Sequence, residues 1–318
     1  MLVGDGERPL RRCVKRRLHR LFVLLALTAL PDVLAAQVMV GVLEEAPLPA
    51  DAARLATNIR VAFRKKLPGW EPICASKADP PWSSACKLPQ AGDALEWTVL
   101  DAGRVVGRAR TRGWLSNDWY AAEGVLRLTS PPPPRAGVRS MDYAGWPGQA
   151  VFRPLAATHG ATPQGKSKWH EVAAGSADRT RVFEAFKGLA ARIPACKPGG
   201  RSRPIRIADV DVIKVLASVD GRKLVGMHVH RKLAEECYER GGFASDAWFV
   251  LSRSGRVEVL PGRSDRGWPE STMPIEIGDF DSDGEEEALF RFSGYNEDGY
   301  LLFDRDFTRV KRFTWNYH

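Results

Sequence analysis

Three pairs of short, apolar-rich runs, each pair separated by a turn with glycine, most constrain the fold of this chain. The pairs are residues 95–100 with 104–109, 213–218 with 223–230, and 248–252 with 256–260. Short runs rich in β-branched and aromatic residues, joined by turns of Gly, Asp and Ser, are typical of β-hairpins. Similar runs follow in the C-terminal part of the sequence. The pattern therefore predicts a mainly β fold built from antiparallel sheets.

One segment has the periodicity of an amphipathic helix. In residues 178–193 apolar side chains recur every three to four positions, and Pro194 follows directly. That spacing places the apolar side chains on one helix face, and proline ends a helix because it has no backbone N–H to donate. Residues 50–58 form a second, weaker helix candidate. With one or two helices beside the strands, the predicted class is mainly β, of the α+β type.

A change in composition indicates two domains. Residues 156–178 are rich in Ala, Gly, Ser, Thr and Lys, as a connecting loop would be. We therefore expect a β-rich N-terminal domain over residues 37–170 and a β-rich C-terminal domain over residues 171–318. For the C-terminal domain the sequence leaves a propeller-like module and a sandwich open.

Residues 1–36 have the order of a secretory signal peptide. The basic segment 11–17 precedes an uncharged apolar run of ten residues, 21–30, and small residues follow at 33–36. That order is typical of a cleaved signal, and the run is too short for a bilayer core, which takes about 20 residues. No later segment is long and apolar enough to cross a membrane. We therefore expect a periplasmic or extracellular protein with no transmembrane segment after cleavage.

Cysteine usage agrees with export. Cys13 leaves with the signal peptide, and Cys74, Cys86, Cys196 and Cys237 remain. An even number of cysteines is what an oxidising compartment favours, although four cysteines allow three different pairings. We expect Cys74–Cys86 and Cys196–Cys237, the pairs nearest in sequence, with buried free thiols as the alternative.

The net charge does not indicate a nucleic-acid partner. The whole chain has a formal charge of +9, but residues 1–36 carry seven Arg or Lys and three Asp or Glu, so about +5 remains afterwards. A modest positive excess on an exported protein fits solvated surface charge, or an anionic polymer of the cell envelope, better than DNA.

The segment from Asp279 to Glu287 is the strongest chemical motif in the sequence. Six carboxylates lie within nine residues, and without a counterion they would repel one another. Carboxylates at loop positions 1, 3 and 5 converge on one point, and Gly284 at position 6 permits a sharp turn. The pattern predicts a cation site, with an acidic hairpin turn that binds no metal as the alternative.

The sequence around this segment differs from an EF-hand and matches another kind of calcium loop. Position 12, which in an EF-hand is a bidentate glutamate, is Phe290, and both flanks, 275–277 and 288–292, have strand character. Residues 278–289 resemble the calcium loop of FG-GAP and VCBS-type repeats. The resemblance implies one structural Ca²⁺ ion and five ligand residues: side chains of Asp279, Asp281, Asp283 and Glu287, and the backbone carbonyl of Glu285.

Two further features are less specific. His228 and His230 lie two residues apart on a predicted strand and would face one side, where they could hold zinc or copper or form a partly exposed strand face. The ten tryptophans fit either a glycan-binding surface or core packing in a β-rich protein.

No nucleophile, zinc-protease or phosphate-binding motif is present. The sequence therefore favours a non-enzymatic calcium-binding protein, one that binds an envelope component or a glycan, with an exported hydrolase of unidentified site as the alternative.

Overall fold

The described part of the chain consists mostly of antiparallel strands. The computed structural model describes residues 38–48, 51–66, 68–73, 94–114, 125–131, 153–158, 168–189, 192–193, 203–229, 246–260, 271–294 and 297–316. All of them belong to one compact unit, Val38–His318. The predicted signal peptide and the four cysteines of the predicted disulfides lie outside the described residues.

The predicted mainly β class is confirmed, with one α-helix in the described part. Within the same ranges the structure contains no helix with the length and apolar character that a membrane crossing needs.

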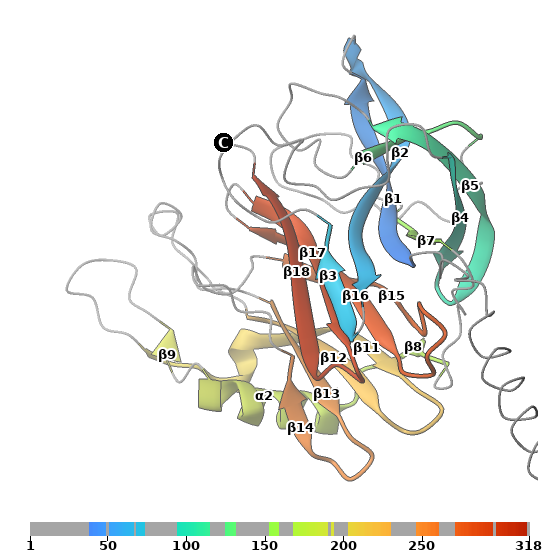
Figure 1. Ribbon diagram of the computed structural model, residues 1–318. Coiled ribbons are helices and arrows are strands. Elements are labelled where there is room, and N and C mark those ends of the chain that lie inside the picture. Colours follow the sequence, from blue (N-terminus) through green and yellow to red (C-terminus); the bar gives the residue numbers. More distant parts are fainter. Residues whose placement is uncertain are drawn as a thin grey trace, which may run out of the picture. The chain divides into compact units, whose positions relative to one another are not determined.

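The first sheet has seven strands: β1 (Met39–Leu48), β2 (Asp51–Lys66), β3 (Gly69–Pro72), β4 (Ala94–Asp101), β5 (Arg104–Trp114), β6 (Val125–Leu128) and β7 (Leu155–Ala157). Their order is β1-β7-β4-β5-β6-β2-β3, and β1 also pairs with β2 (Figure 1). The predicted helix over 50–58 is wrong, because residues 51–58 belong to β2 and pair with β1. Cross-strand pairing with β1, although it is interrupted between Pro47 and Leu48, outweighs the weak helix preference of this short segment.

The second sheet has five strands in the order β14-β13-β12-β11-β8. They are β8 (His170–Val172), β11 (Val210–Ala217), β12 (Lys223–Val229), β13 (Asp246–Leu251) and β14 (Val257–Val259). Between β8 and β11 the chain forms helix α2 (Ser176–Leu189), the two-stranded pair β9 (Arg192–Ile193) and β10 (Arg203–Pro204), and a 3₁₀ turn, η2 (Ile207–Asp209).

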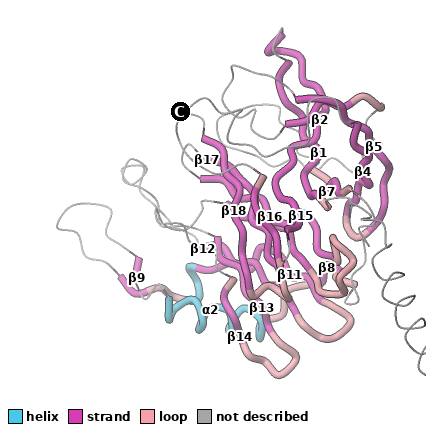
Figure 2. Tube along the Cα trace, in the orientation of Figure 1, coloured by secondary structure: helices cyan, strands magenta, loops and turns pink. Residues whose placement is uncertain are grey.

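Helix α2 confirms the predicted helix with shifted bounds. It begins at Ser176 instead of 178 and ends at Leu189, and Arg192 and Ile193, which the prediction placed in the helix, form β9 and pair with β10. Val182 and Phe186 join a hydrophobic cluster with residues of β11, β12 and β13. Figure 2 shows α2 beside the second sheet, next to β13 and β14.

The third sheet is a meander of four strands: β15 (Ser271–Gly278), β16 (Glu287–Gly294), β17 (Glu297–Asp304) and β18 (Arg309–Asn316). Both of its faces are buried. In β17, Tyr300 and Leu302 pack into a cluster with the first sheet, whereas Leu301 and Phe303 pack into a cluster with the second. The alternation follows from the two-residue period of a strand, which sends neighbouring side chains to opposite faces.

Packing of the second and third sheets matches the sandwich alternative. Trp248 of β13 contacts Phe290 of β16 edge to face, with ring centroids 5.2 Å apart. The described strands show no propeller. The cluster between the first and third sheets combines residues from both sides of the predicted domain boundary near residue 170, and that boundary stays a prediction.

All three predicted hairpins are confirmed. Strands β4 and β5, β11 and β12, and β13 and β14 pair antiparallel. Their turns contain Gly103, Gly221 and Gly255, with φ of 74°, 88° and 85°. Positive φ values are accessible to glycine without a steric penalty, which is why glycine marked these turns in the sequence.

Candidate metal centre

The acidic segment is the loop that joins β15 to β16, so the predicted strand–loop–strand arrangement is confirmed. Gly278 and Glu287 face each other across the base of the hairpin. Gly284 has φ of 88°, as expected for the sharp turn at loop position 6. The loop therefore turns back within a few residues and gathers its carboxylates at one end of the third sheet.

Asp279, Asp281 and Asp283 form a cluster that could hold a metal ion. One carboxylate oxygen from each lies within 4.8 Å of the other two. Oxygens bound to one Ca²⁺ ion at about 2.4 Å are at most about 4.8 Å apart, so the three oxygens fit a shared ion. Glu285 and Glu287 are not part of this cluster, and their role as ligands stays a prediction.

Backbone donors fix the loop around Asp279. Its Oδ1 accepts the N–H of Asp283 at 3.1 Å, and its Oδ2 accepts the N–H of Gly284 at 2.9 Å. The N–H of Glu285 donates to Asp283 Oδ1 at 2.9 Å. Because each carboxylate oxygen has two lone pairs, these bonds orient the oxygens and leave capacity for a cation.

A lysine from the first sheet already contacts the cluster. Lys65 of β2 forms an ion pair with Asp281 Oδ2, and its ammonium lies 3.2 Å from Asp283 Oδ2. The same ammonium lies 5.4 Å from the ring centre of Trp70. Burial lowers the pKa of Lys65, but the two carboxylates outweigh burial and raise that pKa. Lys65 therefore stays charged and balances part of the negative charge.

The aspartates differ in their electrostatic environment. The side chain of Asp281 is 3% exposed, and burial together with the charge of Asp283 raises its pKa in spite of Lys65. Burial acts in the same direction on Asp283, but hydrogen bonding from the Glu285 N–H and Lys65 leaves the pKa of Asp283 below its usual value. The carboxylate of Asp281, which is more buried than that of Asp283, therefore gains more from a further positive charge.

Glu287 lies at the base of the loop and is fully buried. Its Oε2 accepts the N–H of Phe280 at 2.7 Å, and Trp70 Nε1 lies 3.4 Å from its Oε1. Burial, and the charges of Asp281 and Asp283, raise the pKa of Glu287 to about 9. In this arrangement Glu287 joins the loop to the first sheet.

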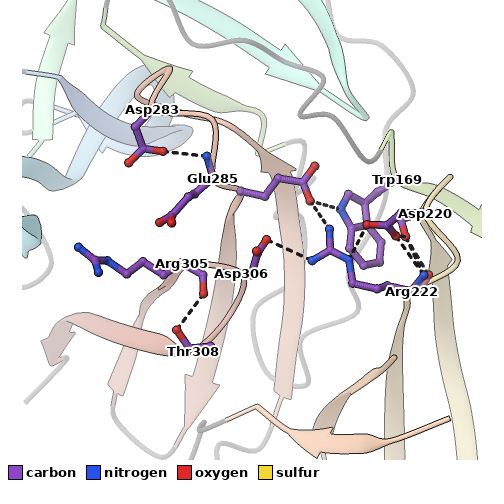
Figure 3. A network of polar contacts seen from close by, with 10 residues as sticks. Trp169, Asp220, Arg222, Asp283, Glu285, Arg305, Asp306 and Thr308 are labelled. Carbon is purple, nitrogen blue, oxygen red and sulfur yellow. Dashed lines mark hydrogen bonds and ion pairs between the residues drawn. The ribbon is translucent and has the colours of Figure 1, made fainter. Parts of the chain in front are cut away.

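The neighbouring Glu286 is directed to the second sheet. Its Oε2 accepts hydrogen bonds from Arg222 and from Trp169 Nε1, each at 3.0 Å. Arg222 also pairs with Asp220 at 2.8 Å and with Asp306 at 3.1 Å (Figure 3). Only some of the six carboxylates in the motif therefore face the candidate cation site.

Sequence reasoning did not identify the residues that surround the loop. Lys65 and Trp70 lie more than 200 positions before their loop partners, and Arg222 lies 64 positions before Glu286. A lysine or a tryptophan on a strand has no local feature that marks such a contact. These partners follow only from the packing of the three sheets.

The histidine pair is only partly described. His228 Nδ1 lies 2.7 Å from Asp246 Oδ1, and Asp246 Oδ2 accepts the N–H of Thr272 at 2.9 Å. His230 lies outside the described residues, so the predicted zinc or copper site stays a prediction.

Among the tryptophans, Trp70, Trp97, Trp248 and Trp315 are at most 4% exposed. Core packing explains these four.

Comparison with protein-family models, with curated proteins and with solved structures gives no match to this chain.

Proposed function

We propose that this chain is an exported, non-enzymatic protein that binds one calcium ion at the loop between β15 and β16. The observation that carries the proposal is the convergence of oxygens from Asp279, Asp281 and Asp283 within 4.8 Å. The resemblance of residues 278–289 to the FG-GAP and VCBS calcium loop supports it. We include the Glu285 carbonyl and the Glu287 side chain in the proposed ligand set.

Calcium fits the donor set better than other metals. The cluster offers only carboxylate oxygens, which suit hard cations, and no imidazole or thiolate that would favour zinc or copper. Mg²⁺ demands a near-ideal octahedron with short bonds, whereas Ca²⁺ accepts irregular sets of six to eight oxygens. A loop that supplies its ligands from alternate positions of one short segment forms an irregular set of oxygens, which suits Ca²⁺ better than Mg²⁺.

The proposed role of the ion is structural. The loop contacts the first sheet through Lys65 and the second sheet through Arg222. A divalent cation would neutralise the aspartates more completely than one ammonium, and would hold the loop in the shape that makes both contacts. The ion would thereby stabilise the packing of three sheets.

Thermal unfolding of the purified protein tests this proposal. We expect a higher melting temperature in Ca²⁺ than in EDTA, because an ion that binds only the folded state adds about 2.7 kcal/mol at a hundred times its dissociation constant. Mg²⁺ at equal concentration should give a smaller shift. Equal melting temperatures in Ca²⁺ and EDTA would rule the site out.

A matched pair of variants locates the effect. Asp281→Asn removes one charge from the cluster and should abolish most of the Ca²⁺-dependent shift. Glu258 lies on β14 and forms an exposed ion pair with Arg256. Glu258→Gln removes one charge from this pair and should leave the Ca²⁺-dependent shift intact. A full Ca²⁺ shift in Asp281→Asn would place the ion elsewhere.

We further propose that the partner is an anionic polymer of the cell envelope. The support is the positive charge of the chain together with the absence of an exposed aromatic platform in the described part. There the exposed large apolar residues are Val105, Ile207, Ile213 and Val219. Sugar rings stack on aromatic side chains, so charge is the better-supported mode of binding.

A further inference from the structure

Strand β5 presents a row of arginines on one face. Arg108, Arg110 and Arg112 are exposed, whereas the alternate residues Ala109 and Thr111 are buried. This is the two-residue period of a strand with one face on the core. The three guanidinium groups therefore project from the same side of the sheet; we call them the arginine row.

The row is regular because β5 is held in register. Across the strand pair, Arg112 faces Ala94, Arg110 faces Glu96 and Arg108 faces Thr98. Residues two apart on a strand are separated by about 6.7 Å, so the row extends over about 13 Å. Three cations at even spacing along a line match a linear polymer with repeated negative charges better than a single small anion.

Most of this charge is not balanced within the described part of the chain. Arg110 pairs with Glu96 at 2.7 Å, but their side chains are 69% and 64% exposed. Exposed ion pairs of this kind contribute little stability and exchange readily with other ions. For Arg108 and Arg112 the described residues provide no ion pair.

We propose that the arginine row binds a linear polysaccharide that carries carboxylate groups, such as a polyuronate. A guanidinium group binds a carboxylate with two parallel hydrogen bonds, and a row of them engages successive sugar units of an extended chain. The proposal rests on the envelope-polymer partner proposed above, but it does not depend on the cation site, which lies on a different hairpin.

The same face argues against single-stranded nucleic acid. Binding of single strands combines positive charge with aromatic side chains on which bases stack. The residues across from the row on β4 are Ala94, Glu96 and Thr98, and none of them is aromatic. Opposite the row, β4 therefore offers charge and hydrogen bonds without a stacking surface.

Calorimetric titration with polygalacturonate, in EDTA and at low and high salt, tests the proposal. We expect binding that weakens as salt rises, because the contacts are between exposed charges. The triple variant Arg108→Gln, Arg110→Gln, Arg112→Gln should lose affinity by about tenfold or more, since each substitution removes a charge-assisted contact. The variant with lysine at the same three positions should lose less, because it keeps the charge and loses the paired hydrogen bonds.

The matched control removes the same net charge from other exposed positions, with Lys187→Gln, Arg256→Gln and Arg309→Gln. Its affinity should stay within about twofold of the unmodified protein, because these three groups do not form a row. Equal losses in the control and in the arginine-row variant would overturn the proposal. So would tighter binding of polyphosphate, or of an oligothymidine strand, than of polygalacturonate.

Two measurements keep this test separate from that of the cation site. Melting temperatures of both triple variants show whether they fold. Because the titration is done in EDTA, a protein that gains no stability from Ca²⁺ would still bind polygalacturonate. Conversely, a calcium-stabilised protein that does not bind polygalacturonate would refute the arginine row and leave the calcium site standing.

Discussion

At the scale of single residues, the most consequential group is a charge buried between the first and third sheets. Glu44 is 6% exposed; it accepts Arg60 Nε at 2.9 Å and the hydroxyl of Tyr300. The guanidinium of Arg60 lies 4.0 Å from the ring centre of Trp315. Burial alone would raise the pKa of Glu44, but the arginine charge and the hydrogen bonds lower it. The carboxylate therefore stays ionised inside the protein.

Removing the partner of this buried charge should be costly. Arg60→Met should destabilise the protein by about 3 kcal/mol, because the buried carboxylate loses its hydrogen-bonded arginine and keeps only the charge of Arg153 and the hydroxyl of Tyr300. Arg110→Gln breaks an arginine–glutamate pair of the same chemistry at the surface and should cost less than about 1 kcal/mol. Urea unfolding of both variants checks the contrast, and similar losses would contradict it.

His228 makes stability depend on pH near neutrality. Its hydrogen bond to Asp246 outweighs burial and raises its pKa above the usual 6.5, with a contribution from the charge of Asp211. The folded protein therefore holds the proton more tightly than the unfolded chain. The stability that this tighter proton binding adds is fully present below about pH 6.5. It is lost as pH rises through the raised pKa of His228.

Replacing the histidine should remove that dependence. His228→Gln should show a smaller loss of unfolding free energy than the unmodified protein as pH rises through this range, with the loss due to the raised pKa of Glu287 remaining, measured by urea titrations at several pH values. Parallel pH profiles for the variant and the unmodified protein would show that another group is responsible.

At the scale of elements, two glycines with different surroundings should respond in opposite ways to alanine. A methyl group at Gly188 of α2 meets no atom within 4 Å, so Gly188→Ala should stabilise by about 0.5 to 1 kcal/mol through helix propensity. A methyl group at Gly299 of β17 would collide with the carbonyl oxygen of Phe313 and the ring of Phe292. Gly299→Ala should destabilise the protein, and thermal unfolding of both variants checks the two signs.

Elements with a strong local pattern were predictable, and elements decided by distant pairing were not. The glycine turns of the β4–β5 and β11–β12 hairpins encode their own conformation, so these hairpins could be read from the sequence. Residues 51–58 were misassigned because their conformation depends on pairing with β1. The candidate site divides in the same way: Asp279, Asp281 and Asp283 converge through local loop geometry, whereas Lys65 reaches them only through sheet packing.

At the scale of the whole molecule, the acidic loop is a junction of three sheets. Lys65 approaches it from the first sheet, and Arg222 connects it to turns of the second and third. Residues far away in sequence therefore balance the charges of the loop. A cation bound there would contact the same aspartate oxygens as Lys65.

A substitution of that lysine separates its role from that of the ion. Lys65→Met should destabilise the protein by about 3 kcal/mol in EDTA, because Asp281 loses its buried partner. Added Ca²⁺ should then restore more stability than it adds to the unmodified protein, since no ammonium competes for the same oxygens. Equal Ca²⁺ shifts in melting temperature would show that lysine and ion do not share the cluster.

The double burial of the third sheet also has a consequence for how the chain folds. The core of the first sheet includes Phe313 and Trp315 beside Val40 and Val42. Contacts between residues so far apart in sequence must close long loops, which slows folding. The N-terminal strands stay partly uncovered until β18, which carries Phe313 and Trp315, packs against them. During that interval their apolar faces are available to chaperones and to aggregation, and the core of the first sheet is complete only once β18 has packed against it.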